Sequence, residues 1–159
     1  MYDGTTTIAA LSGTPAGVVT GDVVQISGSG AYANKNVGTN KTYSLINMAL
    51  SGADAANYGL STGTSMTGTN GTVTAKAITV TGIAANDKVY DATTAATMNV
   101  GNAVFNGMVA GDVLTVAATG TFGSANVAYS GSALAAQMVT FTSTYGGTDA
   151  GNYTYAASP

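Results

Sequence analysis

The chain has 159 residues, of which 45% are hydrophobic and only 7% charged, and its formal net charge is −3. Every acidic residue is Asp and every basic residue is Lys, so the Arg residues and basic clusters typical of nucleic-acid-binding proteins are missing. No apolar run reaches the length of a membrane-spanning helix, and the lack of Cys excludes disulfides and thiolate metal sites. We therefore expect a folded, weakly charged protein that neither binds nucleic acid nor inserts into a membrane.

An internal repeat runs through the whole chain. Three pairs of blocks match, in chain order: MYDGTT (1–6) with VYDATT (89–94), GVVTGDVVQIS (17–27) with GMVAGDVLTVA (107–117), and LSGADAANY (50–58) with YGGTDAGNY (145–153). The offset in residue number between the two members of each pair grows only slowly along the chain, as it does when two copies of one fold diverge in their loops. We predict two domains, 1–76 and 77–159.

Short runs rich in Val, Ile, Thr, Tyr and Phe lie between Gly, Asn and Asp residues in both copies. They are GDVVQIS (21–27), KTYSLINMAL (41–50), GDVLTVAAT (111–119) and AQMVTFTSTY (136–145). Runs this short and this rich in β-branched residues favour strands over helices. The fold class that we predict is all-β, with two tandem immunoglobulin-like antiparallel β-sandwich domains.

The joint between the copies reads TNGTVTAKAITVTG (69–82) and alternates apolar with polar residues, with one change of phase. We expect one β-ribbon to end the first domain and begin the second, in an elongated arrangement without a flexible tether. The first domain has no counterpart of AITVTG (77–82) before Met1, so we expect it to lack its leading strand. The chain is then either a piece excised from a longer array or a module that accepts a strand from another copy.

The repeated nonapeptide predicts a structural corner rather than a reactive site. In immunoglobulin-type sandwiches a Tyr hydroxyl near such a turn returns to the backbone of an earlier segment. Small residues between the Asp and the Tyr fit a tight crossing turn, in which the Asn can cap backbone groups. We assign structural corner and turn roles to two equivalent sets of residues, which are Tyr2, Asp3, Gly21, Asp22, Asp54, Asn57 and Tyr58 in the first copy and Tyr90, Asp91, Gly111, Asp112, Asp149, Asn152 and Tyr153 in the second.

The aromatic residues that recur in both copies are expected in the core. These pairs are Tyr2 with Tyr90, Tyr32 with Phe122, and Tyr58 with Tyr153. Catalysis is not expected, because the chain has no His, Cys or Glu and no pattern that would give a Ser or Thr nucleophile its base. We expect no cofactor. Weak calcium binding through Asp and Asn oxygens, and a Lys to Asn cross-link in NKNVGTNK (34–41), stay open as alternatives.

The matched blocks together resemble the YDG/MBG-type tandem repeats of large bacterial surface proteins, including filamentous-haemagglutinin-like adhesins. The most specific segments are MYDGTTT (1–7), KVYDATT (88–94), the two GDV segments and the two nonapeptides, and the resemblance covers essentially the whole chain. It implies an extracellular stalk that carries no catalytic residues and has neighbouring repeats as its partners. Departures such as Ala92 in the YDG position concern loops.

The reading that follows is a structural spacer of a secreted or cell-surface bacterial adhesin. Its low charge and exposed strand edges also predict end-to-end self-association. A carbohydrate- or matrix-binding module is the alternative from another class, with Tyr43 and Tyr129 among the aromatic residues that could form its binding face. The adhesive ligand itself cannot be read from these residues.

Overall fold

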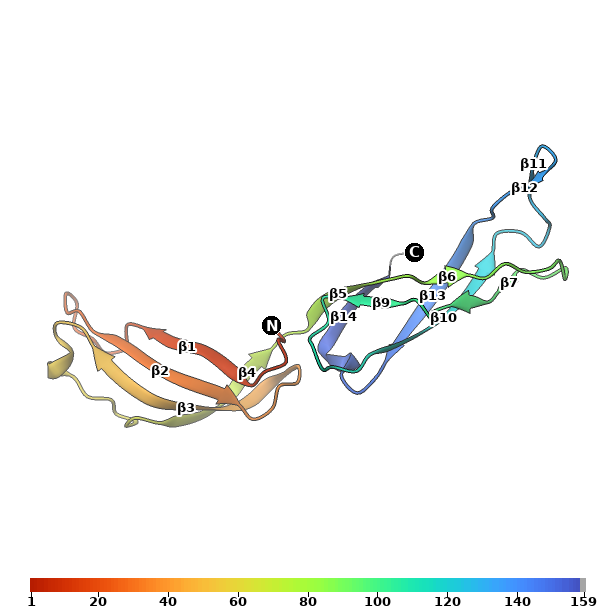
Figure 1. Cartoon of the computed structure of the whole chain (residues 1–159). Coiled ribbons are helices and arrows are strands. Elements are labelled where there is room, and N and C mark those ends of the chain that lie inside the picture. Colours follow the sequence, from red (N-terminus) through yellow and green to blue (C-terminus); the bar gives the residue numbers. More distant parts are fainter. Residues whose placement is uncertain (158–159) are drawn as a thin grey trace. The chain divides into compact units, whose positions relative to one another are not determined.

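The computed structural model describes residues 1–157 and divides the chain into two compact units (Figure 1). Unit 1 comprises Met1–Ala75 and unit 2 begins at Lys76. Within residues 1–157 the only helical segments are two three-residue 3-10 turns, η1 (Ala55–Asn57) and η2 (Ala150–Asn152). The all-β prediction is confirmed.

Unit 1 is an antiparallel meander of four strands in the order β1-β2-β3-β4. The strands are β1 (Thr7–Gly13), β2 (Gln25–Tyr32), β3 (Gly38–Ser51) and β4 (Met66–Val73). The run GDVVQIS predicts a strand from Gly21, but β2 begins only at Gln25. The reason is that the N–H and C=O groups of Val23 bond to Asp54 instead of a neighbouring strand. Val24, Leu45, Met48 and Val73 are buried and form the core of this unit with Tyr2.

Unit 2 has more strands, and most of them are shorter. They are β5 (Lys76–Thr81), β6 (Ala84–Ala85), β7 (Ala95–Ala96), β8 (Met98–Asn99), β9 (Val104–Asn106), β10 (Thr115–Phe122), β11 (Tyr129–Ser130), β12 (Ala133–Leu134), β13 (Val139–Gly146) and β14 (Tyr153–Ala157). Two three-stranded sheets, β13-β10-β7 and β14-β5-β9, lie in a sandwich-like arrangement, and the small ribbon β11-β12 projects beyond the end of β10 and β13 (Figure 1). A second small ribbon pairs β6 with β8. Every pairing among the described strands is antiparallel except that of β14 with β5.

The central strands of the two units pair in the same way. In unit 1 Gly30 of β2 faces Leu45 of β3, and in unit 2 Gly120 of β10 faces Phe141 of β13. The register differs only by a bulge in β3 near Asn47, whose φ of 53° lies in the left-handed region. β1, β2 and the second half of β3 therefore correspond to β7, β10 and β13.

Each unit also has a strand for which the other has no counterpart. In unit 1, β4 pairs with the outer edge of β3, whereas β13 of unit 2 is an edge strand among the described residues. In unit 2, β5 lies between β14 and β9, and no described strand of unit 1 takes that place. The two extra strands are consecutive in the chain, because β4 ends at Val73 and β5 begins at Lys76.

A glycine allows the repeated nonapeptide to cross the chain segment before the central strand. Gly52 has a φ of 115°, and a Cβ there would lie 2.2 Å from the carbonyl oxygen of Val23. Gly147 has a φ of 105°, and its Cβ would lie 2.2 Å from the carbonyl oxygen of Val113. Only glycine adopts this conformation and permits this approach without strain.

We expect Gly147→Ala to lower the free energy of unfolding of the chain by about 1–3 kcal/mol, because the left-handed φ and the backbone contact would both be strained. Gly151→Ala is the matched control in the same turn, since a Cβ there meets nothing within 4 Å. Urea unfolding followed by tyrosine fluorescence measures the difference. Equal midpoints for the two variants would contradict the assignment of Gly147 to the crossing.

Candidate functional site

Two turns of unit 1 are joined by the side chains of the predicted corner. The Tyr58 hydroxyl donates to Asp22 Oδ2 over 2.7 Å and accepts the Val19 N–H over 3.0 Å. Asp54 Oδ2 accepts the Val23 N–H over 2.8 Å, and the Asp54 N–H donates to the Val23 carbonyl over 3.2 Å. We call the segments Val19–Val23 and Gly52–Tyr58 corner 1.

Unit 2 repeats this set of bonds at corner 2, which comprises Val109–Val113 and Gly147–Tyr153. The Tyr153 hydroxyl donates to Asp112 Oδ2 over 2.6 Å and accepts the Val109 N–H over 3.0 Å. Asp149 Oδ2 accepts the Val113 N–H over 3.0 Å. Tyr153 is 5% exposed and Asp112 8%, so the shared hydrogen bond is shielded from water. Such a bond offsets part of the free-energy cost of removing a carboxylate from water.

The turn residues have roles that differ in detail from simple capping. Asp54 does not cap its own 3-10 turn, because its carboxylate reaches across to Val23. Gly21 stands third in a four-residue turn closed by the Asp22 N–H and the Val19 carbonyl, with a φ of 106° that suits glycine. Asn57 closes η1 through its backbone N–H to the Asp54 carbonyl.

The corner raises the pKa of the Tyr58 phenol. The main cause is the hydrogen bond to Asp22, which holds the proton on the hydroxyl. The Val19 N–H that points at the same oxygen acts in the opposite direction. The neutral phenol is thus the form that the folded corner requires, as donor to one loop and acceptor from the other.

The YDG-type segments form Asx turns at both sites. Asp3 Oδ1 accepts the N–H and the hydroxyl of Thr5, each over 2.9 Å. Asp91 Oδ1 accepts the same two groups of Thr93, each over 2.9 Å. Reasoning from the sequence did not single out the two Thr residues, although the spacing Asp-x-Thr occurs in both copies.

Lys88 adds an interaction that unit 1 does not have. Its Nζ lies 2.7 Å from Asp91 Oδ1 and also donates to the Thr93 and Ala95 carbonyls over 2.9 and 3.1 Å. It stands 5.8 Å from the centre of the Phe122 ring. The Lys88 hydrogen bond is the main reason that the pKa of Asp91 falls from 3.8 to about 2.

The expectation that Tyr90 belongs to the core is wrong. Its counterpart Tyr2 is 1% exposed, and its N–H bonds to the Thr74 carbonyl over 2.7 Å just beyond the end of β4. Tyr90 is 58% exposed, since no described strand of unit 2 takes the place of β4. Burial of this tyrosine depends on a strand that is distant in sequence.

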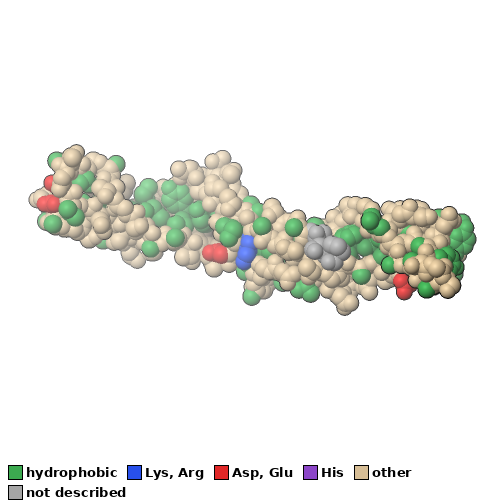
Figure 2. Space-filling model, turned by 90° about the horizontal axis from the view of Figure 1, so that it is seen from above, with side chains coloured by type: hydrophobic (Ala, Val, Ile, Leu, Met, Phe, Trp, Pro, Cys, Tyr) green, Lys and Arg blue, Asp and Glu red, His purple; other side chains and the backbone are tan. Residues whose placement is uncertain are grey.

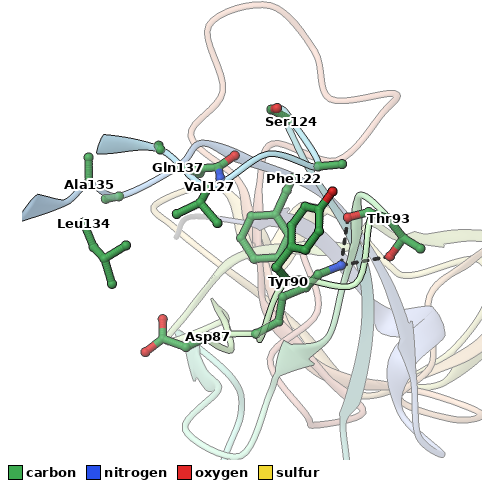
Figure 3. Close-up of a pocket in the computed structure, with 13 residues that line it drawn as sticks. Asp87, Tyr90, Thr93, Phe122, Ser124, Val127, Leu134, Ala135 and Gln137 are labelled. Carbon is green, nitrogen blue, oxygen red and sulfur yellow. Dashed lines mark hydrogen bonds between the residues drawn. The ribbon is translucent and has the colours of Figure 1, made fainter. Parts of the chain in front are cut away.

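An open pocket of about 470 Å³ lies beside Tyr90. Figure 3 shows the rings of Tyr90 and Phe122 next to each other, with Val127 and Leu134 on the side of the β11-β12 ribbon. Lys88 and Gln137 bring polar groups to the same place, and Gln137 Nε2 donates to the Asn126 carbonyl over 2.6 Å. In unit 1 Lys41 makes the equivalent bond to the Asn36 carbonyl over 2.6 Å. We refer to this site as the Tyr90 pocket.

The carboxylates do not gather into an ion site in the part of the chain that the structure describes. No group of three or more Asp side chains with metal-binding spacing occurs there. Asp3, Asp22 and Asp54 each accept hydrogen bonds inside unit 1, as Asp91, Asp112 and Asp149 do inside unit 2. Chemically, both corners hold loops together.

None of the helical segments in residues 1–157 could span a membrane.

Tyr153→Phe should lower the free energy of unfolding by about 1–3 kcal/mol, because the buried Asp112 carboxylate and the Val109 N–H both lose their hydrogen bond to the tyrosine hydroxyl. We expect a smaller loss for Tyr58→Phe, since corner 1 is more exposed to water. Tyr129→Phe is the control, because that ring is 63% exposed. Chemical denaturation of the three variants gives the comparison, and an unchanged midpoint for Tyr153→Phe would contradict the role of corner 2.

The Asp91 carboxyl should titrate at a pH of about 2 in the folded chain. Because this pKa lies below the ordinary value of 3.8, the stability that the contact gives is present above pH 3.8 and lost as the pH falls through about 2. NMR titration of the Asp side chains measures it. Lys88→Met should raise the pKa of Asp91 and leave that of Asp3 unchanged; an equal response of both carboxyls would contradict the assignment.

Comparison with known proteins agrees with the repeat. The family model described as YDG domain matches residues 1–66 and 74–159. No curated protein matches the chain, and no solved structure does. Because the two matched segments cover nearly all of the sequence and each contains one of the corners, the chain belongs to the YDG domain family.

Proposed function

We propose that the chain is a structural spacer module of a large secreted or cell-surface bacterial adhesin, with neighbouring repeats as its partners. The observation that carries the proposal is the use of the repeated polar residues. In both copies the same Asp and Tyr side chains form hydrogen bonds within their own unit. A module whose repeated polar groups stabilise its own fold is suited to act as a spacer that separates other parts of a protein.

The surface supports the same proposal. Figure 2 shows one face on which charged side chains are few and scattered among uncharged polar and hydrophobic atoms. The whole chain has four Lys and seven Asp, and no Arg or Glu. A face of this kind provides weak electrostatic attraction for charged ligands, whereas strand edges can still pair through their backbones. The proposal assigns the chain no catalytic step.

Antibodies against the folded chain test the proposed location. We expect them to label intact cells that make the parent protein, at the same intensity before and after permeabilisation. An antibody against a cytoplasmic protein is the control and should label only permeabilised cells. Labelling by the chain-specific antibody that requires permeabilisation would contradict the proposal.

A carbohydrate-binding module is a second candidate, because Tyr90 lies exposed beside the open pocket of unit 2. Exposed aromatic rings beside hydrogen-bonding groups are a common way to bind small polar ligands. A glycan array distinguishes the candidates. A spacer gives no signal that depends on Tyr90→Ala or Tyr129→Ala, whereas a signal abolished by Tyr90→Ala would favour the binding module.

A further inference from the structure

The place of β5 in unit 2 shows what a complete unit contains. Residues Tyr153–Ala157 pair with Lys76–Val80 in parallel, and Val104–Asn106 pair with Thr79–Thr81 in antiparallel. β5 is therefore the middle strand of its sheet. Its two aliphatic side chains belong to the core, since Ile78 is 4% exposed and Val80 is fully buried at 0%.

Unit 1 holds a groove where unit 2 holds β5. According to the repeat, Pro15 and Ala16 correspond to Phe105 and Asn106 of β9, and 58–62 corresponds to 153–157 of β14. These same residues of unit 1 line a pocket of about 130 Å³, together with Val18, Val24 and Leu50. We call it the unit 1 groove. The two segments that flank β5 in unit 2 thus flank an open space in unit 1.

Corner 1 is less covered than corner 2, although both corners contain the same tyrosine-to-aspartate hydrogen bond. Tyr58 is half-buried and Asn57 exposed, whereas Tyr153 and Asn152 are both 5% exposed. Asp22 is also only half-buried, whereas Asp112 is 8% exposed. Corner 2 therefore has a cover over its tyrosine and aspartate that corner 1 does not have.

At the Tyr90 pocket, unit 2 has the open site and unit 1 has the strand. In unit 1 the carbonyls of Thr72 and Thr74, at the end of β4, accept bonds from the Tyr32 hydroxyl and the Tyr2 N–H. The counterparts of these aromatic residues, Phe122 and Tyr90, line the open pocket of unit 2. Each unit therefore has an open site at the place where the other unit has a strand.

We propose that the unit 1 groove and the Tyr90 pocket are acceptor sites for strands supplied by neighbouring YDG repeats. The unit 1 groove takes a strand of the β5 type, and the Tyr90 pocket takes one of the β4 type. Because β4 runs directly into β5, one joint segment completes the repeat before it with its first half and the repeat after it with its second. This inference rests on the proposed function, in which repeats follow one another in an array.

The chemistry of the donor for the unit 1 groove follows from β5. It is an extended segment that supplies backbone hydrogen bonds on both sides and two buried aliphatic side chains at alternate positions, with one charged residue, Lys76, at its start. A second copy of this chain is a poor donor, because withdrawing its β5 would expose Ile78 and Val80, which are buried in its own unit 2. The occupant is therefore the β5-type half of a joint between repeats, which completes the repeat that follows it, as β5 completes unit 2.

A chain extended by its own leading segment tests the proposal. Residues 76–88 are copied in front of Met1, which stands at the position of Val89 in the repeat. We expect amide hydrogen exchange at 58–62 to slow by on the order of tenfold or more, because these residues gain a strand partner. The matched control carries the same extension with Asp in place of the copied Ile78 and Val80, and should leave the exchange rates unchanged.

A free peptide of residues 76–82 provides the measurement in trans on the unaltered chain. We expect its NMR chemical-shift changes at Ala16, Val18 and 58–62 in unit 1. A peptide of residues 69–75 should instead shift the resonances of Tyr90 and Phe122. The two peptides together assign one donor to each acceptor site.

Three outcomes would overturn the proposal. One is equal exchange at 58–62 in the extended chain and in its Asp control; another is a 76–82 peptide that perturbs unit 2 alone. The third is protection of 58–62 that grows with the concentration of the unextended chain, which would make a second copy the donor. The cell-labelling experiment is independent of all three, so a failure of strand acceptance is distinguishable from a failure of the spacer proposal.

Discussion

The hydrogen bond from a tyrosine hydroxyl to an aspartate carboxylate fixes the geometry on which each unit depends. The chain has no Cys, so its loops are held together without disulfides, and Lys88 forms an ion pair with Asp91. Tyr58 and Tyr153 each satisfy a carboxylate and a backbone N–H at once. Both loops of a corner are then held relative to the central strands.

The boundary between the two compact units falls between two strands that follow each other directly in the chain. β4 and β5 are adjacent in the chain, yet β4 pairs with β3 in unit 1 and β5 pairs with β9 and β14 in unit 2. The joint thus contributes to two cores within a few residues. This explains why Ile78 and Val80 alternate with Thr on one side of the joint, while Val73 is buried on the other.

The sequence was informative where a contact is local or repeated, and not where it depends on a distant strand. The nonapeptides predicted corners because Asp and Tyr recur at fixed spacing, and short β-branched runs predicted an all-β fold. Tyr90 looked identical to Tyr2, but its exposure depends on a strand that unit 1 has and the described part of unit 2 does not. The parallel pairing of Tyr153–Ala157 with β5 was equally unreadable, because its partner lies at the opposite end of unit 2.

Strand acceptance gives a physical reason for the large hydrophobic residues at the surface of unit 2. Val89 is 89% exposed and Leu134 76%, beside a Tyr90 ring that is 58% exposed. Such side chains on an isolated domain favour association and cost solubility. If a strand of the β4 type lies across the Tyr90 pocket, the same residues become the edge of a core, as Tyr2 and Val73 are in unit 1. Hydrophobic residues that are exposed on a single module would then be buried in the array. Their positions on unit 2 mark the surface to which the next repeat binds.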